Sequence, residues 1–482
     1  MSERLSEPTY VSPLAARFAT SEMLRNFSEI RKFQTWRRIW IALAEAEKEL
    51  GLPISARQIA ELRAHRDDVA LEAANEYERK FRHDVMAHVR AYGDQCPRAR
   101  RIIHLGATSC EVTDNADIII LRDALRILRR RLVNLIDRLA AFAERHRDTP
   151  TLGWTHFQPA QPTTVGKRAC LWVQDFAMDL EEIETRLSRL KLRGVKGTTG
   201  TQASFLELFD GDARKVERLE NLVVRKLGFD SSFAVTGQTY PRKLDAQVLD
   251  AVCGIGQSAH KFANDIRLLM HLREIEEPFE KGQIGSSAMA YKRNPMRCER
   301  ITGLARFLIC LQPNASLTAA EQWLERTLDD SSNRRLSLPE AFLAADAILH
   351  IALNVASGLV VRPKAIRRNV ARELPFMATE AILMAAVKAG GDRQDLHERI
   401  RRHSIAAAEA LAEGADANDL LERIAKDPLF ASVRKKLPDL ADPRRFVGRA
   451  PQQVEAFLRK VVRPIRRKYP PRKRGLAAKL RV

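Results

Sequence analysis

The chain is 482 residues long, and 45% of its residues are hydrophobic and 29% are charged. This length predicts about two to four domains, and the apolar content excludes a disordered chain. Lysine and arginine outnumber aspartate and glutamate by 81 to 61, so the formal net charge is +20. A charge of this sign favours acidic ligands or nucleic acid as partners.

Much of this charge belongs to the C-terminal tail. Residues 459–482 contain eleven lysines and arginines and no acid. We expect a basic enzyme with a solvated tail. The alternative is a tail that binds RNA or a membrane surface, because runs of like charge bind phosphate backbones without reading sequence.

The cysteines and the N-terminus indicate the compartment. Six cysteines are scattered without a C-x-x-C pair, so the sequence predicts neither a zinc site nor a disulfide framework. The first residues lack the basic-then-apolar order of a signal peptide, and no uninterrupted apolar run is long enough to cross a bilayer. We therefore expect reduced thiols and a cytoplasmic protein.

Helical periodicity dominates the chain. Apolar residues recur every three or four positions in 33–50, which predicts an amphipathic helix. Leucines recur at spacings of four and three from Leu121 to Leu139, after N-capping residues at 113–115, and predict a long bundle helix. Further helices are predicted at 163–192, at 244–269, after Pro295, and at 317–333 with a kink near Pro339.

We predict an all-α fold of three mostly helical domains, because strand signals are few and nothing alternates with period two over a useful length. The domains are an N-terminal helical domain (1–111), a central helix bundle (112–364) and a smaller C-terminal helical domain (365–482) that ends in the basic tail. The apolar stripes exceed what one bundle can bury, so we expect some helix faces to meet other subunits.

Groups capable of chemistry concentrate just before a predicted helix. Gly282 and Gly285 permit unusual backbone angles, and Pro295 suits a first helical turn, so residues 282–295 are predicted to form a mobile catalytic loop. The alternative is a polar linker. The loop supplies two hydroxyls, a cation and an amide that can converge on a carboxylate, from Ser286, Ser287, Lys292 and Asn294.

Three other stretches are candidates. His156 lies in a loop-like stretch between two predicted helices, where an imidazole can titrate near neutral pH, although a structural histidine is the alternative. Arg82, His83 and Asp84 lie in a helical run and alternatively form an exposed charged face. The glycine-spaced loop 196–202 offers backbone N–H groups that could cradle an anion, but it lacks the order of a P-loop.

Residues 286–295 read SSAMAYKRNP and resemble the signature SSxMPxKxNP of the fumarase, aspartase and argininosuccinate lyase superfamily. Ala290 replaces the proline of that signature, so this loop should be less stiff. Further segments narrow the resemblance to the adenylosuccinate lyase family. They are SPLAAR (12–17), RHDVMAH (82–88), HLGATS (104–109), THFQPAQ (155–161), KGTTGTQ (196–202) and ERTLDDS (325–331).

This resemblance implies an architecture and catalytic roles. It implies a homotetramer whose bundles form a twenty-helix core, with active sites shared between subunits. It implies that Ser286 is the base, that His156 is the general acid, and that Glu299 orients His156. Lys292 and Asn294 would hold the carboxylate that takes up charge. No metal or organic cofactor is implied.

The resemblance also implies contacts with a nucleotide substrate. His83 would lie near the phosphate or succinyl end and count among the catalytic groups as well. Phe18 replaces the tyrosine expected beside Arg17, which removes one hydroxyl donor. The implied substrate-binding residues are Arg17, Arg82, His83, Asp84, Thr108, Ser109, Gln238, Arg300, Arg326, Ser331 and Arg335.

The implied reaction is elimination of fumarate from adenylosuccinate to give AMP, and from succinylaminoimidazole carboxamide ribotide (SAICAR) to give AICAR, in purine nucleotide biosynthesis. A base removes the proton beside a carboxylate, a cation stabilises the resulting dianion, and an acid protonates the departing nitrogen. The alternatives are an argininosuccinate lyase-like C–N lyase and a basic RNA-binding protein that retains the lyase fold. The arginines near the matched segments favour a phosphorylated substrate.

Overall fold

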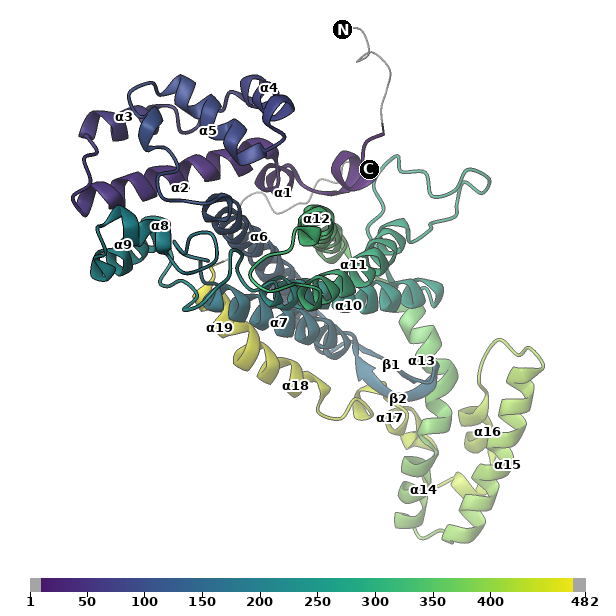
Figure 1. Cartoon of the computed structure of the whole chain (residues 1–482). Coiled ribbons are helices and arrows are strands. Elements are labelled where there is room, and N and C mark those ends of the chain that lie inside the picture. Colours follow the sequence, from purple (N-terminus) through teal and green to yellow (C-terminus); the bar gives the residue numbers. More distant parts are fainter. Residues whose placement is uncertain (1–9, 471–482) are drawn as a thin grey trace.

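The structure, a computed structural model, describes residues 10–470, and its mostly helical class agrees with the prediction. A bundle of long helices forms its centre (Figure 1). In this bundle α6 packs against α7 and α12, and α10 packs against α7, α11 and α12. The five helices are α6 (Ser109–Arg145), α7 (Val165–Arg189), α10 (Lys243–His271), α11 (Met296–Ala320) and α12 (Asp329–Gly358).

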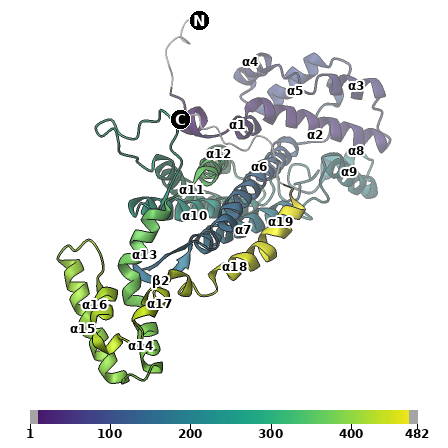
Figure 2. The same ribbon diagram turned by 180° about the vertical axis from the view of Figure 1, so that it is seen from behind.

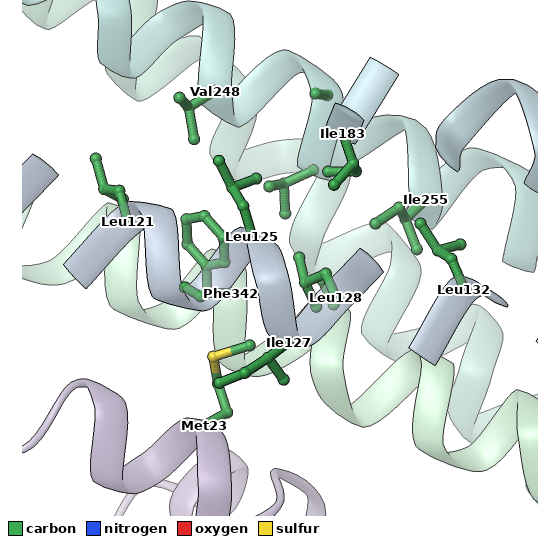
Figure 3. Close-up of a cluster of buried hydrophobic side chains, with 14 of the residues drawn as sticks. Met23, Leu121, Leu125, Ile127, Leu128, Leu132, Ile183, Val248, Ile255 and Phe342 are labelled. Atoms are coloured by element: carbon green, nitrogen blue, oxygen red, sulfur yellow. The ribbon is translucent and has the colours of Figure 1, made fainter. Parts of the chain in front are cut away.

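The leucine repeat of α6 faces the middle of the bundle, as its spacing predicted. Leu125, Leu128 and Leu132 are fully buried. The helix begins at Ser109 rather than at 113–115, because Thr108 forms an N-terminal capping box with Glu111. Figure 3 shows the α6 leucines meeting side chains of α1, α7, α10 and α12, among them Met23, Ile183, Val248, Ile255 and Phe342.

An N-terminal group of shorter helices covers the beginning of α6. The predicted amphipathic helix at 33–50 is confirmed as α2 (Glu29–Glu49), which buries Trp36 and Trp40 and packs against α6. The helix α9 (Ala213–Lys226), which is distant from α2 in the sequence, also packs against it. The remaining elements here are η1 (Leu14–Phe18), α1 (Ser21–Asn26), α3 (Ala56–Ala64), α4 (Leu71–Phe81), α5 (Asp84–Gln95) and α8 (Ala203–Leu208).

The far end of the bundle carries two small antiparallel sheets that the sequence did not predict. Strands β1 (Pro150–Thr155) and β2 (Gln158–Thr164) form a hairpin, and β3 (Ile275–Glu276) pairs with β4 (Val360–Val361). A register shift between Leu152 and Gly153 and the two prolines of β2 break the period-two alternation that would have revealed the hairpin.

The predicted helix at 317–333 is wrong. The chain leaves α11 at Ala320, forms a loop, and begins α12 at Asp329, while Pro339 lies inside α12. The apolar residues that suggested a continuous helix are exposed: Leu317 is 65%, Trp323 70% and Leu324 98% exposed. Leu324 also has a φ of 47°, which is incompatible with a right-handed helix.

The helix α12 is long and apolar enough to span a bilayer by length and composition, which the sequence analysis did not expect of any segment. However, 78% of its apolar window is buried inside the protein. Ala341, Phe342, Ala345 and Ile348 are fully buried in the bundle. Its hydrophobicity therefore reflects a central position in the core.

The C-terminal part has an apolar core of its own. Residues between Ala378 and Leu440 form a hydrophobic cluster separate from the one that fills the bundle and the N-terminal helices. Figure 1 shows α14, α15 and α16 projecting from the end of the bundle, beyond α13. The helices are α13 (Pro363–Met377), α14 (Thr379–Lys388), α15 (Arg393–Ala412), α16 (Leu420–Lys426) and α17 (Leu437–Leu440).

The chain then returns along the outside of the bundle, as Figure 2 shows from behind. Helix α18 (Ala450–Phe457) packs against α7, and α19 (Arg463–Lys468) packs against α6, with η6 (Leu458–Val462) between them. Val462 is fully buried, and Arg466 pairs with Asp137 at 2.7 Å. Residues 459–468 are therefore anchored to the bundle by Val462 and Arg466, although cations such as Arg459, Lys460 and Arg463 are exposed as a solvated tail predicts, and residues 471–482 lie outside the described residues.

We predict that the two parts of the basic tail differ in their importance. A chain that ends at residue 470 should unfold at the same urea concentration as the full chain, because it keeps Val462 and Arg466 in place. A chain that ends at 457 should lose at least about 1.5–3 kcal/mol, the value of burying one aliphatic side chain. Equal midpoints for the two truncated chains in urea unfolding would contradict this prediction.

Candidate active site

Several predicted substrate-binding residues meet where α5, α6 and α12 come together. His83 Nε2 lies 3.4 Å from Ser109 Oγ, and Asp84 pairs with Arg335 of α12 at 3.2 Å. The Nδ1 atom of His83 accepts a hydrogen bond from Met86 N, so a neutral ring carries its proton on Nε2, directed at Ser109. Arg82 precedes His83 and is exposed at the left-handed C-cap of α4.

Gln238 joins the same end of the bundle from the loop before α10. Its backbone N–H donates to Glu325 O at 2.9 Å, next to Arg326, and its side-chain amide donates to Thr198 O at 3.1 Å. Cys110 Sγ, beside Thr108 and Ser109, lies 3.8 Å from Gln238 Oε1. These residues lie at the N-terminal end of α6. Together with Ser331 at the start of α12, we call them the α6-end cluster.

The α6-end cluster presents cations to solvent. Arg335 is 64% exposed at its side chain, and Arg326, which lies 3.5 Å from Asp330, is 25% exposed. Lys32 of α2 belongs to the same neighbourhood. Burial, followed by the positive charge of Arg335, lowers the pKa of Lys32, and its ammonium group lies 4.9 Å from the Trp36 ring centroid. Such a group of cations suits a phosphorylated ligand.

A buried ionic network in the core of the bundle supports the α6-end cluster. Arg242 donates to Asp330 at 2.7 Å and to Asp114 at 3.1 and 3.2 Å, and all three side chains are at most 3% exposed. Asp114 also accepts from Tyr240 N at 2.8 Å. The Arg242 guanidinium and other cations hold the pKa of Asp114 below its usual range despite complete burial. The network links α6, α12 and the start of α10.

The glycine-spaced loop 196–202 does cradle an anion, but that anion is part of the protein. Lys196 N and Gly197 N donate to the Glu111 carboxylate at 3.0 and 2.7 Å. Lys196 itself pairs with the buried Glu220 at 2.7 Å. The backbone N–H groups at 196 and 197, which the sequence suggested for a ligand anion, are therefore already occupied.

His156 occupies the turn of the β1–β2 hairpin, so the loop-like stretch predicted from the sequence is a strand pair. Both turn residues, His156 and Phe157, have positive φ angles of 53° and 57°, as a tight two-residue hairpin turn requires. The His156 side chain is exposed. Its position at a tip leaves the imidazole free to approach a ligand outside the chain's own bundle.

The predicted catalytic loop 282–295 forms an exposed excursion between β3 and α11. Ile284 is 75% and Tyr291 84% exposed. The loop is pinched at its base, where Asn294 Nδ2 donates to Gly285 O at 2.8 Å. The Ser286 hydroxyl oxygen accepts hydrogen bonds from Ala288 N at 3.3 Å and Met289 N at 3.1 Å, so its own proton is free to be donated.

Other predicted residues stand near the loop or apart from it. Lys292 is exposed in the loop, and Glu299 is exposed in the first turn of α11, followed by the half-buried Arg300. Arg17 is exposed on η1, which packs against α12. In the described residues 10–470, no group of three or more His, Cys, Asp and Glu side chains is arranged to hold a metal ion.

One chain does not bring these groups together. The 37 residues of α6 extend over about 55 Å and separate Thr108 from the hairpin that carries His156. The 25 residues of α11, about 37 Å long, separate the loop 282–295 from Arg326. Within residues 10–470, no hydrogen bond or ion pair connects His156 to Ser286, Lys292 or Glu299.

The sequence matches known proteins over nearly its whole length. Residues 16–309 match the family described as Lyase, and residues 375–457 match the adenylosuccinate lyase C-terminus. Adenylosuccinate lyase of Saccharomyces cerevisiae is 55% identical over 456 residues, which cover 94% of this chain and 95% of that protein. The enzyme of Schizosaccharomyces pombe is 55% identical over 457 residues, with the same coverage of both chains.

The chain belongs to the adenylosuccinate lyase family. It is therefore a C–N lyase of purine nucleotide biosynthesis. Solved structures of less similar proteins show the same fold. Fumarate lyase from Mesorhizobium sp. BNC1 superimposes with a TM-score of 0.77 at 26% identity, covering 94% of this chain and all of that one. The 3-carboxy-cis,cis-muconate lactonizing enzyme from Pseudomonas putida gives 0.79 at 24% identity, covering 94% and 98%.

Sequence reasoning missed two features of this family member's site. Lys32 gave no signal, because it lies just before the predicted amphipathic helix 33–50 and belongs to none of the matched segments. Glu111 could have been found, since Thr108 and Glu111 have the spacing of a capping box. The sequence pattern could not show that this carboxylate also reaches Arg193 and the loop 196–202, because those contacts depend on tertiary structure.

We predict that Gly285→Ala impairs catalysis without unfolding the protein. A Cβ atom at position 285 would lie 2.0 Å from Lys292 O, so the pinched base of the loop would have to open. Because the loop is exposed, the unfolding midpoint should barely change, while kcat/KM should fall at least about tenfold. Gly303→Ala in α11 is the matched control, since Gly303 has no positive φ and its Cβ would meet nothing within 4 Å. Equal kcat/KM values for the two variants would contradict the prediction.

Proposed function

We propose that the chain eliminates fumarate from adenylosuccinate to give AMP, and from SAICAR to give AICAR. The observation that carries this proposal is the α6-end cluster, where hydroxyl, amide and guanidinium groups face solvent together. These are the donors that suit a phosphate and a ribose. The 55% identity to two adenylosuccinate lyases supports the same substrates.

In this proposal Ser286 is the base, acting as the alkoxide after its hydroxyl has given its own proton to solvent. Two backbone N–H groups, from Ala288 and Met289, point at its Oγ and would stabilise negative charge on that oxygen. The exposed loop that carries Ser286 would close over the substrate and exclude water. Lys292 and Asn294 would hold the carboxylate that takes up charge when the proton leaves, which requires Asn294 to exchange its bond to Gly285 for one to the ligand.

His156 is proposed as the general acid that protonates the departing nitrogen, with Glu299 orienting its ring. The exposed tip of the hairpin allows His156 to enter a site formed elsewhere. His83, whose Nε2 proton is directed at Ser109, would hold the phosphate or succinyl end of the substrate. The remaining proposed contacts are Arg17, Arg82, Asp84, Thr108, Ser109, Gln238, Arg300, Arg326, Ser331 and Arg335.

We further propose that the active protein is a cytoplasmic homotetramer whose bundles form a twenty-helix core and whose sites are shared between subunits. The separation of Thr108, His156 and Ser286 along the bundle supports this arrangement, since one chain cannot assemble all three. Uncovered apolar side chains on the bundle helices support it as well. They include Leu171, Met178, Leu268, Phe307 and Leu317.

The three-part division at 1–111, 112–364 and 365–482 also remains a proposal. The separate hydrophobic cluster between Ala378 and Leu440 supports a C-terminal unit. The N-terminal helices share one cluster with the bundle, so the boundary near 111 is a change in helix arrangement rather than a gap between cores.

We predict that Ser286→Ala abolishes most turnover but leaves nucleotide binding intact. Removal of a general base costs about 10²–10⁴-fold in kcat. The affinity for AMP, measured by calorimetry, should change by less than about threefold, because the hydroxyl is not expected to hold the nucleotide. Ser287→Ala is the matched control and should keep most activity. Near-normal turnover by Ser286→Ala, measured as fumarate release, would refute its role as the base.

We predict that two inactive variants complement each other. If His156 and Ser286 come from different subunits, mixing His156→Ala with Ser286→Ala after subunit exchange should restore up to about a quarter of the sites. Mixing Ser286→Ala with Lys292→Ala is the control and should restore nothing, because both residues belong to the same loop. A lack of recovery in the first mixture, with exchange verified by mass spectrometry, would contradict shared sites.

A further inference from the structure

Glu111 is a buried carboxylate whose hydrogen bonds converge from several segments. Its side chain is 2% exposed, and Oε2 accepts from Thr108 N at 2.6 Å. Oε1 accepts from Lys196 N at 3.0 Å, from Gly197 N at 2.7 Å and from the guanidinium of Arg193. Three of these four donors bond Oε1 and one bonds Oε2, so both oxygens are held by groups of the protein itself. Because the side chain is also buried, Glu111 is not positioned to contact a ligand.

Arg193 extends these contacts to a third segment. Its side chain is fully buried, and Nη2 donates to Gly197 O at 2.6 Å and lies 3.5 Å from Gly237 O. Gly237 precedes Gln238, whose side chain in turn donates to Thr198 O at 3.1 Å. The Glu111–Arg193 pair thus connects the start of α6, the loop 196–202 and the segment 236–238.

The three segments fit together with no spare room. A Cβ atom at Gly200 would lie 1.9 Å from Thr236 O, and one at Gly237 would lie 2.6 Å from Glu325 O. A displacement of one segment must therefore move its neighbours. The start of α6 carries Ser109, and the segment 236–238 carries Gln238 and contacts Glu325 in the loop that carries Arg326.

We propose that Glu111 and Arg193 form a positioning pair that sets the spacing of Thr108, Ser109 and Gln238 for the nucleotide. This inference rests on the proposed function, and it assigns to the pair no contact with the substrate. A buried ion pair is a poor way to stabilise a protein, because desolvation offsets most of its attraction. Its multiple directional bonds instead specify one arrangement of the three segments.

The test compares KM with kcat. Glu111→Gln keeps the shape of the side chain but turns one acceptor into a donor, facing backbone N–H groups, and leaves Arg193 without its counter-charge. The affinity of the binding segments for the substrate and for the transition state should then fall by the same factor. KM for adenylosuccinate should rise at least about tenfold, while kcat changes less than about threefold. A purely structural role would instead lower the amount of folded enzyme and leave KM unchanged.

A second variant and a control keep the test decisive. Arg193→Lys retains the positive charge but cannot bridge Glu111, Gly197 O and Gly237 O at once, so KM should rise here too. Asp427→Asn is the matched control, because Asp427 is a buried carboxylate with bonds from His403 and Leu429 N in the separate C-terminal core. It should lower thermal stability without changing KM.

AMP affinity, measured by calorimetry on the full chain, separates this inference from the proposed reaction. If the parent protein binds AMP but does not cleave adenylosuccinate, the proposed reaction fails, while a weaker AMP affinity in both variants still supports the positioning pair. Unchanged KM and AMP affinity in folded Glu111→Gln would overturn the inference. Failure of both variants to fold would also overturn it, by assigning the pair to stability alone.

Discussion

The arrangement of the bundle depends on a buried positive charge that must be paired with acidic side chains. Arg242 is buried between Asp114 of α6 and Asp330 of α12, and a buried guanidinium is tolerated only when it is fully paired. A shift of either helix by one turn would leave an uncompensated charge in the core. Apolar packing brings α6, α10 and α12 together, but this ionic network selects how the helices are aligned along one another. Gln238, Arg326 and Ser331 lie within a few residues of the network in the sequence, so their positions depend on that alignment.

The two parts of the proposed site differ in rigidity for a physical reason. The α6-end cluster stands on buried ionic bonds and close-packed glycine contacts, which suits the recognition of a fixed nucleotide. The loop 282–295 has few such supports and leaves Ile284 and Tyr291 in solvent. A group that must move onto the substrate and leave again is better carried by a segment whose opening costs little free energy.

Much of the fold was predictable because local pattern and tertiary burial agree. The leucines of α6 and the aromatic residues of α2 are buried where their spacing places them. The prediction failed at 317–333, where apolar residues such as Leu324 are exposed and pattern no longer reports burial. The hairpin around His156 was hidden by prolines and a register shift. The candidate site residues were proposed from motifs, whereas the partners of Glu111 depend on contacts between distant segments that no motif shows.

The separate hydrophobic cluster between Ala378 and Leu440 has a consequence for how this chain can change. Its apolar side chains pack mainly on one another, so a substitution there is absorbed locally and does not propagate into the bundle. The helices α14 to α17 therefore form a region in which sequence and loop length can drift while the α6-end cluster keeps its geometry. A binding surface for another molecule could be acquired there without disturbing the chemistry.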